Sequence, residues 1–274
     1  MNNKAGFALI AIALALAPAH SAPSPTPLTP TSKWNVEYAD NMCILSRSYR
    51  AQSGMFVLAF KPAPMADSIQ LIVLHEHGSG RSAGRAEVGF GPASPPVEGS
   101  YFSAPLAGKP LHVTAIDVKR AITKSLEQYG VLTIKAGRIE DLAFAVDRAG
   151  LAFKSLDTCV ADLLKGWGMD EAAIASITTY PTPLMEPFHG ITDADYPDEA
   201  IRNNEEGATG VRFVVGVDGL LRDCTIVESS GSALLDRTTC KLIMKRARFA
   251  PARDRNGTSV SSVTFTRVRW RLPQ

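Results

Sequence analysis

Apolar residues recur in short runs along residues 33–170, and turn signals separate these runs. The runs are WNVEY, CILSRSY, MFVLAF, IQLIVLH, AEVGF, LHVTAI and VLTI. Segments rich in Pro, Gly and Ser lie between them, namely KPAP, HGSG, GPASPP and LAGKP. Short apolar runs between turn residues are typical of β-strands. The pattern predicts a strand-rich front domain over residues 33–170, with a mainly antiparallel sheet.

Two stretches within this region follow the three-to-four-residue spacing of a helix instead. They are Asp117–Tyr129 and Asp147–Trp167, and Gly168 follows the second as a stop signal. The apolar face of the second stretch comprises Leu151, Phe153, Leu156, Cys159, Val160 and Leu163. We therefore expect an α+β fold for the front domain, which resembles no family that we recognise.

A hairpin follows a proline-punctuated linker, which we place at residues 171–187. Asp218-Gly219 is the strongest short hairpin signal in the chain. The return strand carries Cys224 and Ile226 on one face. The strand before the turn alternates apolar and other residues, with Val211, Phe213, Val215 and Val217 at the apolar positions. One face of this hairpin is therefore expected to be buried.

A short helix is predicted before the hairpin. It is expected to contain Ala200 and Ile201, to follow Asp193 or Asp195 as a candidate cap, and to stop at Gly207.

An amphipathic helix and a final strand are predicted after the hairpin. The helix spans Ser232–Phe249, because Pro251 forbids its continuation. Its core candidates are Leu235, Leu242 and Ile243. In the strand, one face is expected to carry Thr264, Thr266, Val268, Trp270 and Leu272, and the other Val263 and Phe265. The sequence thus predicts two helices against a three-stranded antiparallel sheet over residues 188–274.

The motifs in this order resemble the carboxy-terminal domain of the TonB family. They are Tyr196-Pro197, Gly210 before the alternating strand, Asp218-Gly219, Ser229-Ser230-Gly231, Leu235-Asp236, Arg248-Phe249-x-Pro251 and a terminal Val-x-Trp-x-Leu. The resemblance covers residues 188–274 and nothing before them. It implies a periplasmic module that binds a short extended peptide of an outer-membrane receptor by adding it as a strand to a sheet edge.

The same resemblance assigns candidate peptide-binding residues. Tyr196 and Pro197 match a family segment near the receptor contact, although Asp193-Ala194-Asp195 stands where well-studied members have a glutamine before this pair. The edge strand would contribute Val263, Phe265, Arg267, Arg269 and Arg271. Its arginines would either attract an acidic peptide or keep the edge from aggregating. The edge could also pair with itself in a homodimer.

The amino terminus has the organisation of a signal peptide over residues 1–22. Lys4 provides a positive start, Gly6 to Ala17 an apolar segment, and small residues a cleavage site. Residues 23–32, PSPTPLTPTS, are expected to form a short extended tether. We therefore expect a periplasmic protein, which would be membrane-associated only if the signal stays uncleaved as an inner-membrane anchor.

Composition adds a limit on partners and a prediction about the cysteines. The formal net charge of +2 gives no reason to expect a nucleic-acid partner. In an exported chain with four cysteines, pairing within each domain would join Cys43 to Cys159 and Cys224 to Cys240. The alternative is four buried free thiols.

Motifs for catalysis or metal binding are weak. Gly80-Arg81-Ser82-Ala83-Gly84 has the spelling of a nucleophile elbow, but no helical pattern follows it. His75-Glu76-His77 offers only two metal ligands on one strand face. We therefore expect no metal, no cofactor and no enzyme activity, and predict a binding module for an envelope protein or an outer-membrane receptor peptide. The alternatives are an energy transducer with an uncleaved anchor and an envelope enzyme with its site in the front domain.

Overall fold

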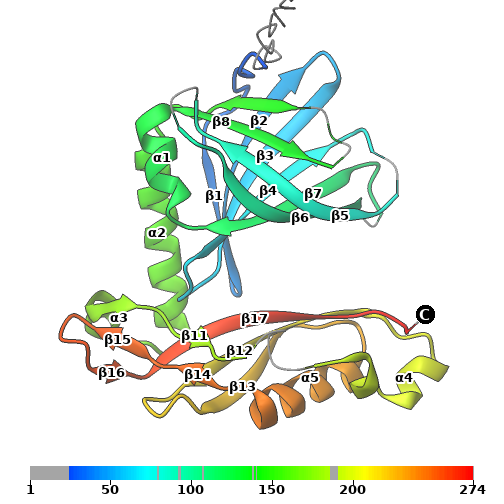
Figure 1. The fold of residues 1–274 in the computed structure, drawn as a ribbon, viewed down its shortest axis with the longest axis vertical. Coiled ribbons are helices and arrows are strands. Elements are labelled where there is room, and N and C mark those ends of the chain that lie inside the picture. Colours follow the sequence, from blue (N-terminus) through cyan, green and yellow to red (C-terminus); the bar gives the residue numbers. More distant parts are fainter. Residues whose placement is uncertain are drawn as a thin grey trace, which may run out of the picture.

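The front part of the chain is a curled, nine-stranded antiparallel sheet (Figure 1). The computed structural model describes residues 25–78, 80–91, 94–106, 108–137, 139, 141–185 and 191–273, so the predicted signal peptide lies outside the described residues. The strand order is β1-β2-β3-β4-β7-β6-β5-β8-β9. The strands are β1 (Asn35–Ala39), β2 (Met42–Ala51), β3 (Gly54–Pro62), β4 (Ser68–His75), β5 (Ser82–Gly89), β6 (Val97–Pro105), β7 (His112–Lys119), β8 (Val131–Ala136) and β9 (Leu142–Ala145).

The segment that the sequence predicts as a tether helps to close this sheet. The backbone N–H of Leu28 donates to the carbonyl of Ala143 in β9 at 2.8 Å, and that of Thr31 donates to the carbonyl of Ser48 in β2, also at 2.8 Å. Leu28 also packs against the front core. Residues 28–31 therefore belong to the front fold and bridge its two margins, which a free tether would not do.

Helices line one side of the curled sheet (Figure 1). They are α1 (Ile122–Tyr129) and α2 (Ala149–Gly166), and Phe153 of α2 meets Phe60 of β3 edge-on with ring centroids 5.0 Å apart. The predicted start of the first helix at Asp117 is wrong, because Asp117 pairs within β7. Leu151, which the pattern places on the buried face of α2, is 71% exposed. The buried face of α2 is therefore narrower than the apolar pattern predicts.

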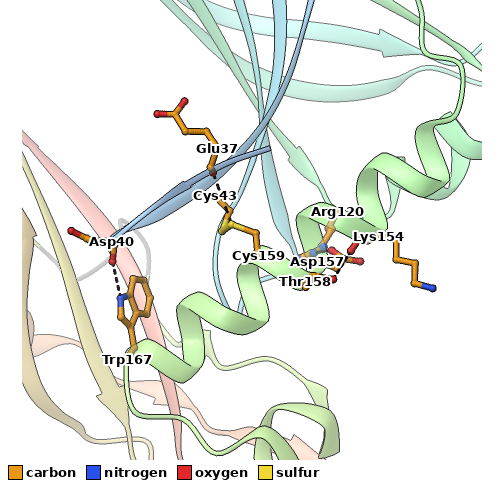
Figure 2. Close-up of a disulfide and its surroundings, with 9 residues drawn as sticks. All are labelled: Glu37, Asp40, Cys43, Arg120, Lys154, Asp157, Thr158, Cys159 and Trp167. Atoms are coloured by element: carbon orange, nitrogen blue, oxygen red, sulfur yellow. Dashed lines mark hydrogen bonds and ion pairs between the residues drawn. A yellow bond between two sulfur atoms is a disulfide. The ribbon is translucent and has the colours of Figure 1, made fainter. Parts of the chain in front are cut away.

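A disulfide joins the sheet to α2, as predicted (Figure 2). Cys43 of β2 is bonded to Cys159 of α2 across a sequence separation of 116 residues, and both are almost fully buried. At the end of the same helix, the indole N–H of Trp167 donates to the carbonyl of Asp40 at 3.3 Å. The two contacts hold α2 against the β1–β2 hairpin.

The C-terminal part contains the predicted three-stranded antiparallel sheet, in the order β13-β12-β17. The strands are β12 (Gly207–Val215), β13 (Leu221–Glu228) and β17 (Ser262–Trp270), and the helices are α4 (Asp198–Arg202) and α5 (Ala233–Arg246), with a 3-10 turn η2 (Asp193–Asp195). Helix α5 ends before Phe249, which pairs instead in the short strand β14 (Phe249–Ala250). The short helix that is predicted before the hairpin does not extend to Gly207, because Gly207 is already the first residue of β12.

The predicted hairpin lies where the sequence places it. Val215 pairs with Leu221, and the Gly219 N–H donates to the Gly216 carbonyl at 2.9 Å. Gly219 has φ +75°, and a Cβ there would come within 2.1 Å of the Phe249 carbonyl oxygen. No other residue fits this turn without strain. Val217, predicted as a buried strand position, is 58% exposed because β12 has already ended.

Part of the predicted linker is paired with the C-terminal part. The short strand β10 (Ile177–Thr179) pairs with β15 (Ala252–Asp254), which in turn pairs with β16 (Ser259–Val260). Strand β11 (Thr182–Pro183) pairs with β14. The short helix α3 (Glu171–Ser176) precedes them, capped by Asp170, whose side chain accepts from two backbone N–H groups. The chain between the two sheets is therefore ordered by pairing up to Pro183.

Candidate functional site

A cleft of about 350 Å³ runs along the free edge of β17. In the part of the chain that the structure describes, β17 pairs with β12 on one side and with no strand on the other. Three consecutive residues of β17, Phe265, Thr266 and Arg267, line the cleft. Because consecutive side chains of a strand point to opposite faces, a cleft lined by three in a row follows the edge of the strand. The backbone edge is thus accessible from the cleft.

The opposite wall of this cleft comes from the front part. It is formed by residues of the β1–β2 turn, of the β3–β4 connection and its flanking strands, and of β7, namely Asn41, Met42, Lys61, Pro62, Ala63, Pro64, Ser68, Gln70 and Asp117. Figure 1 shows β17 running between the curled sheet and the rest of the C-terminal part. The cleft is therefore a feature of the whole chain, since neither part alone provides both walls.

The two faces of the C-terminal sheet have different neighbours. Phe213 pairs with Thr264 and Thr209 with Val268, and this face packs on α4 and α5. On the other face, Val263 belongs to the core of the front part and the Arg212 guanidinium lies 5.9 Å from the ring centroid of Trp167. The predicted alternation of β17 is confirmed, and the face that carries Val263 and Phe265 is the one turned toward the front part.

The three arginines predicted at the edge lie on that front-facing side. The Arg269 guanidinium stands 4.2 Å from the ring centroid of Phe102 in β6, and the Arg271 guanidinium 5.4 Å from the same centroid. Arg267 is ion-paired with Glu228 of β13. Arg269 and Arg271 also line a second cleft of about 350 Å³, together with Arg81 and Phe102. Because Arg269 lines both clefts, the two clefts adjoin along β17.

Glu228 joins three elements of this interface. Its carboxylate lies 3.5 Å from the Lys61 ammonium of β3 and accepts hydrogen bonds from Arg267. Burial lowers the pKa of Lys61, and the charge of Arg267 lowers it further, whereas Glu228 acts in the opposite direction. Beside them, the Asn41 side chain donates to the Val227 carbonyl at 3.0 Å. Polar contacts thus hold the front part on the C-terminal sheet.

Tyr196 and Pro197, predicted as receptor contacts, have structural roles here. The Tyr196 ring is 6% exposed, meets Trp270 edge-on at 5.2 Å and donates its hydroxyl to the Glu205 carbonyl at 2.5 Å. Pro197 immediately precedes α4, where its fixed φ suits the start of a helix. The structure therefore separates these two residues from the cleft, whose lining does not include them.

The Ser-Ser-Gly and Leu-Asp motifs meet at one buried carboxylate. Asp236 is 7% exposed and accepts hydrogen bonds from the Thr209 hydroxyl at 2.8 Å, the Ser229 hydroxyl at 2.6 Å and the Ser230 N–H at 2.9 Å. Burial alone would raise the pKa of Asp236, but these hydrogen bonds outweigh it and hold the pKa below its usual value. The motif is therefore structural: it fixes the end of β13 to the start of α5.

Asp195, one of the two candidate helix caps, makes hydrogen bonds beyond those of a cap. It accepts from the Thr192 N–H at 2.9 Å and receives two hydrogen bonds from Arg246 at the end of α5, at 2.6 and 2.7 Å. The Arg246 hydrogen bonds, followed by that of Thr192, lower the pKa of Asp195 to about 2. This pair connects the entry of the C-terminal part to its long helix.

The second predicted disulfide is present in the same part. Cys224 of β13 is bonded to Cys240 of α5 across a sequence separation of 16 residues. Both lie against the C-terminal core. All four cysteines are therefore paired, and the alternative of free thiols does not hold for this structure.

The weak chemical motifs do not converge on a site. Ser82 is the first residue of β5 rather than the tip of a strand-to-helix turn. The ring of His75 is engaged by the His77 carbonyl and by the Thr114 hydroxyl, the latter at 3.2 Å. Across the described residues, no group of three or more His, Cys, Asp or Glu is placed to hold a metal ion. Nor does any described helix combine the length and apolar character that a membrane span needs.

The sequence does not predict the walls that the front part contributes to the two clefts. Lys61 lies in KPAP, a segment that the sequence predicts as a turn. Phe102 lies in a part of β6 for which the sequence pattern predicts no strand. No local pattern marks either residue, because each acts only through packing against the other part of the chain.

Comparison with known proteins identifies the C-terminal part. Residues 192–272 match the family model described as Gram-negative bacterial TonB protein C-terminal, which confirms the resemblance predicted from the motifs. No curated protein matches the chain. The C-terminal part is thus a TonB-like protein-interaction domain of the cell envelope, and the match leaves the front part unassigned.

Proposed function

We propose that this protein is a periplasmic binding module that docks an extended peptide of an envelope or outer-membrane partner as an added strand on β17. The observation that carries this proposal is the outer edge of β17, which pairs with no strand among the described residues and opens into a cleft of about 350 Å³. The family match supports a protein partner.

The physics of a sheet edge explains how such a partner would bind. An edge strand presents backbone N–H and C=O groups at every second residue, and an extended segment satisfies them whatever its sequence. An added strand lies about 4.8 Å from its neighbour. Main-chain hydrogen bonds then provide affinity, and the side chains that line the cleft provide selectivity.

A periplasmic location is part of the same proposal. Two disulfides suit an oxidising compartment. Fractionation of a Gram-negative host, with sequencing of the mature amino terminus, tests this. A soluble product that starts between residues 20 and 23 agrees with the proposal. An intact Met1 in the membrane fraction would favour the transducer alternative instead.

The docking mode is tested by amide hydrogen exchange, measured by NMR on the mature chain. The probe is an acetylated and amidated host peptide of sequence Ser-Thr-Val-Ser-Val-Thr-Ser at saturating concentration. Strand addition should protect every second amide of β17, namely those that point away from β12. Protection at another surface, or none at all, would contradict docking on β17.

A further inference from the structure

The cleft along β17 has walls from two parts of the chain, so a strand docked there would contact both. Side chains of an added strand alternate between the two faces of the sheet that it extends. One set would therefore lie over the helix face. The other set would point to the side on which Phe265, Arg267 and Arg269 project, where Lys61 and Gln70 of the front part line the cleft.

Positive charge gathers on this front-facing side. Arg267, Arg269 and Arg271 follow one another along β17, and Arg81 approaches from the loop before β5. The carboxylates that line the two clefts are already engaged: Glu228, beside the first cleft, pairs with Lys61 and Arg267, and Asp117 accepts from Gln70 at 3.0 Å. Glu206, in the second cleft, accepts from the Leu272 backbone N–H at 2.9 Å.

Arg269 shows the effect of this crowding. Burial lowers the pKa of Arg269, and the charges of Arg271, Arg267 and Arg81 lower it further, against a weaker opposing effect of Asp117. Its guanidinium lies over Phe102, and the ion pairs among the described residues do not include it. An anion placed between these cations would relieve their mutual repulsion.

We infer that the front part serves as the second wall of the peptide site and selects extended peptides that carry acidic side chains at the positions facing Lys61, Arg81 and Arg269. This inference rests on the proposed docking of a strand on β17. In this arrangement the front part contacts every second side chain of the peptide, and the TonB-like sheet makes the contacts to the peptide backbone.

Peptide binding by the full mature chain tests the charge selection. Three probes are compared by fluorescence polarisation: the host peptide, a version with its central serine replaced by glutamate, and a version with lysine there. For each substituted probe, a second peptide is made in which the substituted position is moved by one residue. In one of the two registers, the glutamate peptide should bind about fivefold more tightly than the host peptide, and the lysine peptide should bind more weakly than the host peptide.

A variant of the front part tests the composite site. Arg81 is exposed, so Arg81→Glu should leave the fold intact and reduce the preference for the glutamate peptide over the host peptide about fivefold. The matched control is Arg50→Glu, another exposed arginine of the front part that lines neither cleft. It should change neither affinity.

Photo-crosslinking provides the second measurement. A benzophenone side chain placed at the front-facing peptide position should label residues 61–70, and the neighbouring position should not. Equal affinity for all three probes, or labelling confined to residues 191–273, would overturn the composite site while strand docking stands. If none of the three probes binds, strand docking fails, and the inference fails with it.

Discussion

The indole N–H of Trp270 donates to the hydroxyl oxygen of Thr239 across 2.8 Å, and the same hydroxyl donates to the Leu235 carbonyl, also at 2.8 Å. Both side chains are buried. One residue of β17 is thereby fixed to α5, so the helix that covers the back of the sheet also sets the position of the edge strand. The proposed docking on β17 would depend on that position, because an edge strand that shifts presents its backbone groups in a different register.

Replacement of this hydroxyl should therefore destabilise the C-terminal part. Thr239→Val keeps the shape of the side chain but leaves a buried indole N–H without an acceptor. We expect a loss of about 1–3 kcal/mol in the free energy of unfolding, measured by urea denaturation. Thr238→Val, one position along α5 and outside this pair, is the matched control. Equal stability of the two variants would argue against the hydrogen bond as a support of β17.

Stability should also depend on pH through Asp195. Its pKa is lowered to about 2 by Arg246 and Thr192, below the value of about 3.9 expected in the unfolded chain. The ionised carboxylate therefore stabilises the fold above about pH 4, and this contribution is lost as the pH falls through about 2. The difference in urea midpoint between wild type and Asp195→Asn should shrink over this range. A difference that stays constant from pH 6 to pH 2 would rule out this linkage.

Sequence patterns predicted the C-terminal part well because its elements bury one face each. Alternation in β12 and β17 and the Asp218-Gly219 turn fix the hairpin and the strand faces locally. The errors lie where tertiary contacts override a local pattern. The sequence pattern places Phe249 at the end of a helix, but Phe249 pairs with Pro183. The same kind of pattern places Leu151 in the core, but Leu151 is 71% exposed.

The candidate site was predicted only in part. The edge strand follows from the order of the elements, and its arginines from their alternation. The opposite walls do not follow, because Lys61 reaches the first cleft and Phe102 the second only through the packing of two parts that are far apart in sequence. Tyr196 illustrates the reverse case: its motif marks the family, whereas in this structure its ring fills the core beside Trp270.

Removal of the disulfides should weaken the protein to different degrees. In the chain-entropy model, the loop closed by Cys43 and Cys159 stabilises by about 5 kcal/mol and the loop closed by Cys224 and Cys240 by about 3 kcal/mol. We expect the double alanine variant of the first pair to lose more stability in urea denaturation without reductant. The second pair serves as its comparison. A larger loss for Cys224 and Cys240 would show that the loop lengths do not determine the order.

The contact between the two parts is tested at Glu228. This carboxylate lies between Lys61 and Arg267, with side chains 15% and 35% exposed, so its replacement leaves two cations facing each other. Glu228→Gln should cost about 2 kcal/mol. The loss should be smaller in a Lys61→Met background, because one of the opposed charges is then absent. Glu199→Gln, at an exposed residue of α4, should have no effect. Additive losses for Glu228→Gln and Lys61→Met would mean that the two residues do not interact, and that this ion pair does not hold the front part on the C-terminal sheet.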